Sequence, residues 1–168
     1  FMTLGIPNSE VYNALLSLMA LNIFDDTKLE NVNEQILSQS KDVGEIIELF
    51  NTVLNTVSYD NYPISSEAVV QQLLYMYLKG ICNSVSAELH SSKGRADLVI
   101  ESDNRRIVFE FKYAKNEIEA KVKLSEAIEQ IKTRDYGNIV PKKAELLRIA
   151  AVFNADPKVR AFTEYHEV

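Results

Sequence analysis

The sequence has no tryptophan and only one cysteine among its 168 residues. One thiol cannot form a disulfide within the chain, and such sparing use of cysteine is typical of a reducing compartment, so we expect a cytoplasmic protein. No apolar run approaches the roughly 18–20 residues of a membrane-spanning helix, so we expect no membrane partner. The composition, 46% hydrophobic and 25% charged, is that of an ordinary globular protein of about one domain.

The signature motifs of two common enzyme classes are also missing. The sequence contains no Gly-x-x-x-x-Gly-Lys-Ser/Thr run, which excludes ATP binding through a P-loop within this chain. It contains no Gly-x-Ser-x-Gly elbow either, and this disfavours an acyl hydrolase of the α/β-hydrolase type.

Positive charge is not in excess, since the net charge is −6. Residues 1–79 hold three lysines and ten acids, a balance of −7, whereas residues 80–168 hold fifteen basic and fourteen acidic residues, a balance of +1. The second half could meet a phosphate backbone, although it has no strong basic stripe. Charge therefore permits a nucleic-acid partner without indicating one.

The first half of the sequence has the apolar periodicity of helices. We expect one helix that starts near residues 7–10 and reaches residue 21, a second over 29–39 and a third over 42–57. After a loop at 59–64, Ser65 or Ser66 can cap a fourth helix, which Gly80 would end. Residues 1–60 are thus predicted as a helical lead-in packed on the core, and residues 61–168 as a second, α/β unit.

Beyond Gly80 the apolar period changes from that of a helix to that of a strand. Strands are predicted over 84–90, 95–102 and 105–113, a helix over 116–134, and two further strands over 146–154 and 159–168. The second half is therefore expected to follow the order β-β-β-α-β-β after the fourth helix, and the expected fold class is α/β (α+β).

The second and third predicted strands form a hairpin around the polar turn candidate Asp103-Asn104. The resulting register pairs Ser102 with Arg105, Ile100 with Ile107, Leu98 with Phe109 and Asp97 with Glu110. Directly opposed side chains point to the same face of a sheet and lie about 4.5–5.5 Å apart at Cβ. The carboxylates of Asp97 and Glu110 should therefore converge.

Alternation puts Lys112 on the same face as Glu110, two residues along the strand. The other face is apolar and carries Leu98, Ile100, Ile107, Phe109 and Phe111. Two buried carboxylates repel each other, and a divalent cation such as Mg²⁺ or Mn²⁺ would resolve that conflict. The alternative is a solvated hairpin in which the acids pair with Lys112, Arg95 or Arg106.

The pattern Asp…Glu-x-Lys over a hairpin resembles the PD-(D/E)XK nuclease superfamily. The segments Gly94-Arg95-Ala96-Asp97-Leu98-Val99-Ile100 and Phe109-Glu110-Phe111-Lys112 are similar to the nuclease-like domain that follows a AAA-ATPase-like module in many bacterial proteins. Similar residues extend to Gln130-Ile131-Lys132 and to Val152-Phe153. The stretch from Leu4 to Val11 resembles the lead-in between the ATPase-like and nuclease-like parts.

The resemblance implies a restriction-endonuclease-like α-β-β-β-α-β core with a mixed central sheet in residues 61–168. It also implies Asp97 and Glu110 as metal ligands and the Phe111 carbonyl as a candidate third ligand. It makes Lys112 the catalytic lysine and Gln130 the glutamine of the following helix that faces the site. Glu67 takes the place of an acid in the first helix and is a candidate for binding metal or water. Gln71, where relatives often have histidine, cannot titrate.

The leading hypothesis is a Mg²⁺-dependent (or Mn²⁺-dependent) nuclease that hydrolyses phosphodiester bonds in DNA, with RNA as the other substrate. The resemblance also implies an upstream AAA-ATPase-like domain that is absent from this chain. The alternative is a catalytically silent module that keeps the nuclease fold and binds nucleic acid or protein. The sequence leaves the oligomeric state open.

Overall fold

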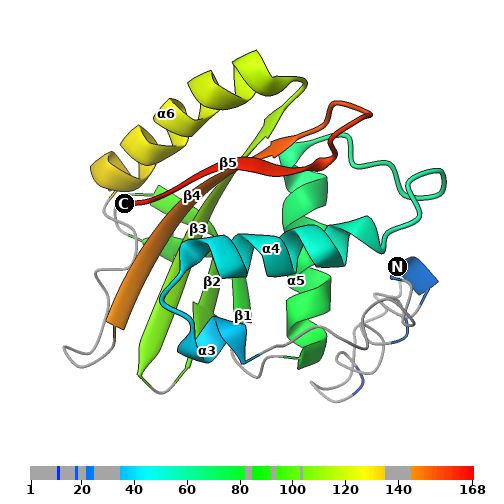
Figure 1. Cartoon of the computed structure of the whole chain (residues 1–168). Coiled ribbons are helices and arrows are strands. Elements are labelled where there is room, and N and C mark those ends of the chain that lie inside the picture. Colours follow the sequence, from blue (N-terminus) through cyan, green and yellow to red (C-terminus); the bar gives the residue numbers. More distant parts are fainter. Residues whose placement is uncertain are drawn as a thin grey trace, which may run out of the picture.

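The computed structural model describes residues 11, 18, 22–24, 35–81, 85–91, 94–102, 104–134 and 145–168 (Figure 1). Its elements follow the predicted order, with helices first and a β-β-β-α-β-β series after them. They are α3 (Ile36–Gln39), α4 (Val43–Asn55), α5 (Glu67–Ile81), β1 (Val85–Ser91), β2 (Gly94–Glu101), β3 (Arg105–Ala114), α6 (Glu117–Arg134), β4 (Glu145–Asn154) and β5 (Ala161–Glu167).

Local sequence signals account for the ends of two helices. The Asp42 carboxylate accepts a hydrogen bond from Gly44 N at 2.7 Å and so caps α4. The Ser66 hydroxyl accepts from Val69 N at 3.4 Å, which makes Ser66 the cap of α5. The predicted stop at Gly80 is one residue short, because α5 continues to Ile81; a glycine inside a helix costs about 1 kcal/mol relative to alanine and does not by itself end the helix. The predicted helix near residues 7–21 and most of the one over 29–39 lie outside the described residues.

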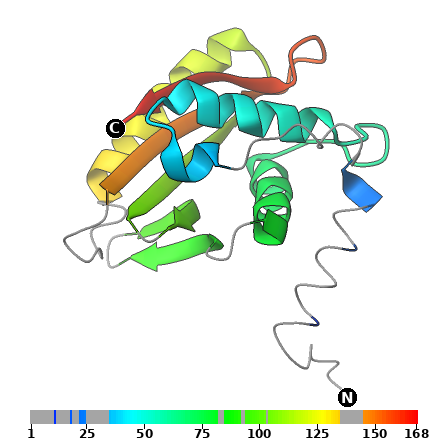
Figure 2. The same cartoon turned by 60° about the horizontal axis from the view of Figure 1, so that its bottom comes forward.

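The sheet has five strands in the order β1-β2-β3-β4-β5. β3 and β4 are parallel and all other neighbours are antiparallel, so the predicted mixed sheet is confirmed. Parallel neighbours need a crossover, and α6 supplies it by covering one face of the sheet between β3 and β4. Figure 2 shows α4 on the opposite face from α6.

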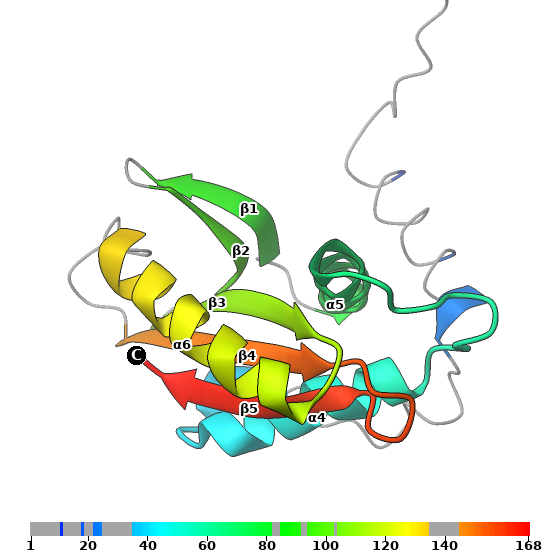
Figure 3. The ribbon, with the colours of Figure 1, turned by 90° about the horizontal axis from the view of Figure 1, so that it is seen from above.

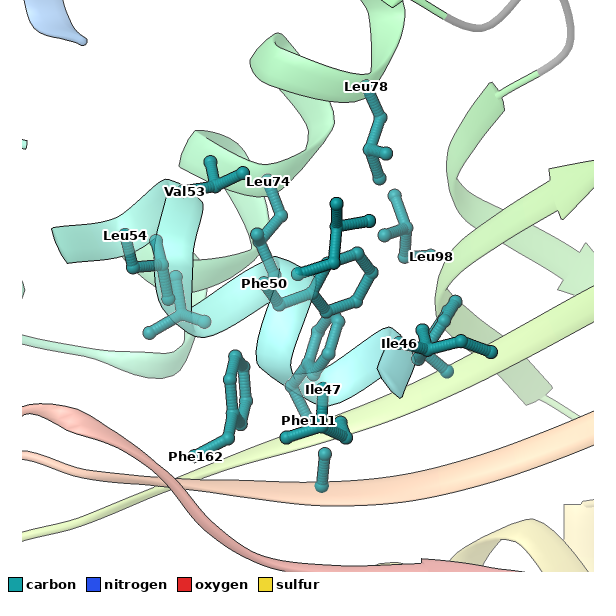
Figure 4. Packing of buried hydrophobic residues seen from close by; sticks show 14 of the residues in the cluster. Ile46, Ile47, Phe50, Val53, Leu54, Leu74, Leu78, Leu98, Phe111 and Phe162 are labelled. Carbon is teal, nitrogen blue, oxygen red and sulfur yellow. The ribbon is translucent and has the colours of Figure 1, made fainter. Parts of the chain in front are cut away.

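The larger core lies between the sheet and helices α4 and α5. Its centre is a group of rings, with Phe50 of α4 at 5.0 Å from Phe109 and Phe111 at 5.5 Å from Phe162 (Figure 4). All five residues predicted for the apolar face of the hairpin lie in this core: Leu98, Ile100, Ile107, Phe109 and Phe111. Residues of α4 share this core with β3. The division into a lead-in over residues 1–60 and a second unit over 61–168 stays a prediction.

The opposite face of the hairpin carries a smaller core under α6. Val99 and Val108 pack there with Ala127, Ile131 and Ala150, as expected for strands covered on both sides. No helix in the described part of the chain is long and apolar enough to span a bilayer.

Candidate functional site

The candidate site forms where β2 leaves β3. The β2–β3 ladder contains Leu98–Phe109, Val99–Val108, Ile100–Ile107 and Glu101–Arg106, which confirms the predicted register. It ends at Leu98–Phe109, whereas β3 stays paired with β4 as far as Ala114. Residues 110–114 of β3 therefore have an edge that β2 does not cover. Figure 3 shows β1 and β2 bending away from β3, with α5 beside them.

Asp97 lies at this divergence, one residue beyond the last β2–β3 pair. Its Oδ2 accepts a hydrogen bond from Phe111 N at 2.8 Å, and its main-chain oxygen accepts from Gln71 Nε2 at 2.6 Å. The predicted pair of Asp97 with Glu110 is thus missing from the ladder, because the carboxylate rather than the strand backbone bonds to β3. The two carboxylates still lie close enough to repel each other.

Glu110 and Lys112 lie on the same side of β3, as alternation predicts. Lys112 Nζ is 2.9 Å from Glu110 Oε1, 3.0 Å from the Phe111 carbonyl oxygen and 3.5 Å from Glu67 Oε1. Glu110 is 1% exposed, so it is not the solvated acid of the alternative hypothesis. That hypothesis is correct in one respect, since Glu110 does pair with Lys112. Arg106 pairs with Glu101 instead.

The ionisable groups of the site have strongly perturbed pKa values. Burial, and after it the charge of Glu110, raise the pKa of Asp97 from 3.8 to about 7, against the lowering effect of the Phe111 N–H and Lys112. Burial also raises the pKa of Glu110, although the hydrogen bond from Lys112 lowers it in part. The surrounding carboxylates raise the pKa of Lys112 and keep it an ammonium ion.

One carboxylate oxygen of the site is not used by any donor that the structure describes. Glu110 Oε2 is buried and has no hydrogen-bond partner among the described residues. The neighbouring Asp97 carboxylate accepts the Phe111 N–H at its Oδ2. A buried carboxylate oxygen without a donor is costly, and a hard cation would satisfy it.

The described residues contain no group of three or more His, Cys, Asp or Glu side chains placed to hold a metal ion. A cation here would therefore take two carboxylates and a main-chain oxygen. The Phe111 carbonyl is suitable, because it lies at the uncovered edge of β3 and already accepts from the Lys112 ammonium. All three candidate ligands are oxygens, and oxygen ligands suit Mg²⁺ and Mn²⁺.

The remaining residues identified in the sequence differ in how closely they approach Asp97, Glu110 and Lys112. Glu67, in the first turn of α5, reaches the site through its 3.5 Å contact with Lys112, and its side chain is 39% exposed. Gln130 is half-buried on α6, and no hydrogen bond joins its side chain to Asp97, Glu110 or Lys112 in the described structure. Gln71, identified in the sequence only as a departure from histidine, contacts Asp97 directly.

Comparison with known proteins assigns a family to the part of the chain that contains these residues. The family model described as PD-(D/E)XK nuclease superfamily matches residues 65–163, more than half of the chain, and the match includes β2, β3 and α6. No curated protein matches the chain. The chain belongs to the PD-(D/E)XK nuclease superfamily.

Proposed function

We propose that this member of the PD-(D/E)XK nuclease superfamily is a Mg²⁺-dependent nuclease that hydrolyses phosphodiester bonds in DNA, in preference to RNA. The observation that supports it most is the buried, unpartnered Glu110 Oε2 next to the Asp97 carboxylate. A fold that needed these acids only for stability would supply them with donors, since unsatisfied buried carboxylates are destabilising.

Asp97, Glu110 and the Phe111 carbonyl would hold the cation, and Mn²⁺ could replace Mg²⁺ on the same oxygens. When bound, the cation would lower the pKa of a water molecule and offset the charge that develops on the phosphate. Asp97 is prepared for this role because the Phe111 N–H binds its Oδ2 and so fixes the direction of the carboxylate.

Lys112 would hold and orient the attacking water through its ammonium group, which is also placed to stabilise negative charge on the phosphate. Its position supports this role, since its Nζ lies within 3.5 Å of Glu110, Phe111 and Glu67 oxygens. Glu67 would act through Lys112 or a water. Gln130 would face the substrate from α6, on the side of the sheet to which Glu110 points.

The direct test is cleavage of plasmid and single-stranded DNA and of RNA with Mg²⁺, compared among the wild type, Asp97→Ala and Lys112→Ala. We expect the wild type to cut DNA only when the metal is present and both variants to lose this activity. Lys121→Ala is the matched control, because Lys121 lies on the exposed side of α6 and pairs with Glu117. Metal-dependent cleavage that survives both substitutions would show the mechanism to be wrong.

A catalytically silent module that binds nucleic acid or protein is the second candidate. The net charge of −6 and the absence of a basic stripe favour it. No cleavage of any substrate, together with no heat of Mn²⁺ binding in calorimetry, would support the module over the enzyme.

The similarity of residues 4–11 to a lead-in leads us to propose a bacterial, cytoplasmic protein in which a AAA-ATPase-like domain precedes this chain. The test is the full open reading frame. A P-loop motif upstream of residue 1 would support the proposal, and a different upstream domain would contradict it.

A further inference from the structure

Asp97 is held by two contacts that are not part of the β2–β3 ladder. One is the N–H of Phe111, beyond the end of the β2–β3 ladder, and the other is the side-chain amide of Gln71 on α5. Of these two contacts, only the one from Gln71 is made to the Asp97 main chain. Its amide nitrogen lies 2.6 Å from the Asp97 carbonyl oxygen.

Hydrogen-bond alternation shows what these contacts replace. Ser102 and Arg105 exchange both of their backbone hydrogen bonds, at 2.8 and 3.4 Å, so they form a hydrogen-bonded pair. Such pairs alternate along an antiparallel ladder, which makes Leu98–Phe109 another one and would make Ala96–Phe111 the next. Phe111 N donates to the Asp97 carboxylate in place of the Ala96 carbonyl.

The same alternation directs the main-chain groups of Asp97 toward β1. The β1–β2 ladder pairs Ala87 with Leu98 and Leu89 with Ala96, so its register is the same on both sides of Asp97. The Asp97 carbonyl oxygen also accepts a hydrogen bond from the Gln71 side chain, which lies outside the sheet. Asp97 is therefore part of β2 but lies beyond the end of the β2–β3 ladder, and a donor from α5 binds its main chain.

We propose that Gln71 is a positioning residue that holds the Asp97 main chain against α5 and away from the β2–β3 ladder, so that its carboxylate stays on the Phe111 N–H and beside Glu110. Without the Gln71 donor, β2 could extend its ladder with β3, Phe111 N would bond to the Ala96 carbonyl, and the Asp97 carboxylate would lose its fixed direction. The inference rests on the proposed function only in taking Asp97 as a cation ligand. Partners that orient a ligand typically change metal affinity by roughly ten- to a hundredfold.

The chain offers a matched control for this residue. Gln71→Met keeps the length of the side chain and removes its donor, and Gln72→Met makes the same change at the next position of α5, where the side chain is exposed. Gln71→Glu is a second variant that keeps the shape of the side chain and lacks the N–H donor. Circular dichroism and thermal unfolding establish that each variant is folded.

The first measurement is amide hydrogen exchange at Phe111 by NMR, without metal. We expect exchange in Gln71→Met and Gln71→Glu to be at least tenfold faster than in the wild type, because the acceptor of this N–H is no longer held. Gln72→Met should match the wild type. The second measurement is the Kd for Mn²⁺, which we expect to weaken by roughly tenfold in the Gln71 variants alone.

Gln71 variants that match Gln72→Met in both measurements would overturn the proposal. So would a lowered melting temperature with unchanged Phe111 exchange and Mn²⁺ affinity, since this is the result of a purely structural role. If neither Gln71 variant folds, Gln71 is a residue of the core and the proposal is wrong. If the wild type binds no Mn²⁺, the proposed metal function fails, and Phe111 exchange still decides whether Gln71 positions Asp97.

Discussion

The two faces of β3 are made from alternate residues of one short stretch and differ in almost every physical respect. Phe109 and Phe111 point into a core of aromatic rings, where each is fully buried. Glu110 and Lys112 point the other way and form an ion pair at 2.9 Å. Glu110 is as buried as the rings, but one of its carboxylate oxygens has no partner among the described residues.

The two faces therefore have different roles. The ring face stabilises the fold, and the acid face could bind a ligand. The ring face is stabilised by burial and by contacts between rings, and its apolar side chains need no polar partner. The acid face buries charged groups, which costs free energy, and it has a carboxylate oxygen that no described donor binds. Substitutions on the ring face should therefore affect stability, and those on the acid face should affect metal binding and chemistry.

The largest effect is expected from Phe50→Ala, on the α4 side of the ring face. Phe50 is fully buried and contacts the rings of Phe109 and Phe111, so its truncation should lower the free energy of unfolding by about 3–5 kcal/mol. Urea unfolding measures the loss, and calorimetry on the folded variant should find the Mn²⁺ affinity within a few-fold of the wild type. A large loss of affinity in a folded variant would contradict the separation of the two faces.

The next largest is expected from Glu110→Gln. This substitution keeps the shape of the side chain and removes the charge that would bind the cation, so Mn²⁺ affinity should fall at least a hundredfold. A loss of this size exceeds the roughly ten- to hundredfold effect of residues that only orient a metal ligand. Glu126→Gln, on the exposed side of α6, is the control. A Glu110→Gln variant with the affinity of the control would show that the acid face does not bind the metal.

A pH dependence should follow from Asp97, whose pKa burial and the Glu110 charge raise from 3.8 to about 7. Between these values the folded state binds the proton more tightly than the unfolded state does, so the stability of the metal-free protein should fall as pH rises from about 4 to 7. Mn²⁺ affinity should increase over the upper part of this interval, as the carboxylate ionises.

Asp97→Asn is the control for this effect, because it has no proton to lose. Urea unfolding at pH 5 and pH 7.5 should give a smaller decrease in stability for the variant than for the wild type. The remaining slope would come from Glu110, whose pKa is also raised by burial. Equal slopes in the two proteins would mean that Asp97 titrates normally.

The smallest effect is expected from Glu67→Gln. Glu67 is 39% exposed and lies 3.5 Å from Lys112, so solvent weakens the interaction. We expect the cleavage rate to fall by less than about tenfold and stability to change by less than about 1 kcal/mol. A loss as large as that of Lys112→Ala would make Glu67 a full member of the site.

The sequence was sufficient for the element order and the hairpin register because both depend on local signals. The strand period of two separated Phe109 and Phe111 from Glu110 and Lys112, and the turn expected at residues 103–104 predicted which residues face each other. The mixed sheet was implied by the resemblance to the superfamily. All of these are properties of neighbouring residues or of one crossover.

The end of the ladder could not be predicted in the same way. Continuing the register gave an Asp97–Glu110 pair, whereas the structure ends the ladder at Leu98–Phe109. The cause is tertiary, since it depends on α5 lying beside the opening and on Gln71 reaching the Asp97 carbonyl. For Gln71 the sequence offered one weak signal, its position one helical turn after Glu67 on the same helix face.

The most direct test of the central claim is a Mn²⁺-soaked crystal examined at a wavelength at which manganese scatters anomalously. The account predicts an anomalous peak between Asp97 and Glu110, within bonding distance of Asp97 Oδ1, Glu110 Oε2 and the Phe111 carbonyl oxygen. A crystal soaked at saturating Mn²⁺ that shows no peak there, with Lys112 still 2.9 Å from Glu110 Oε1, would contradict it.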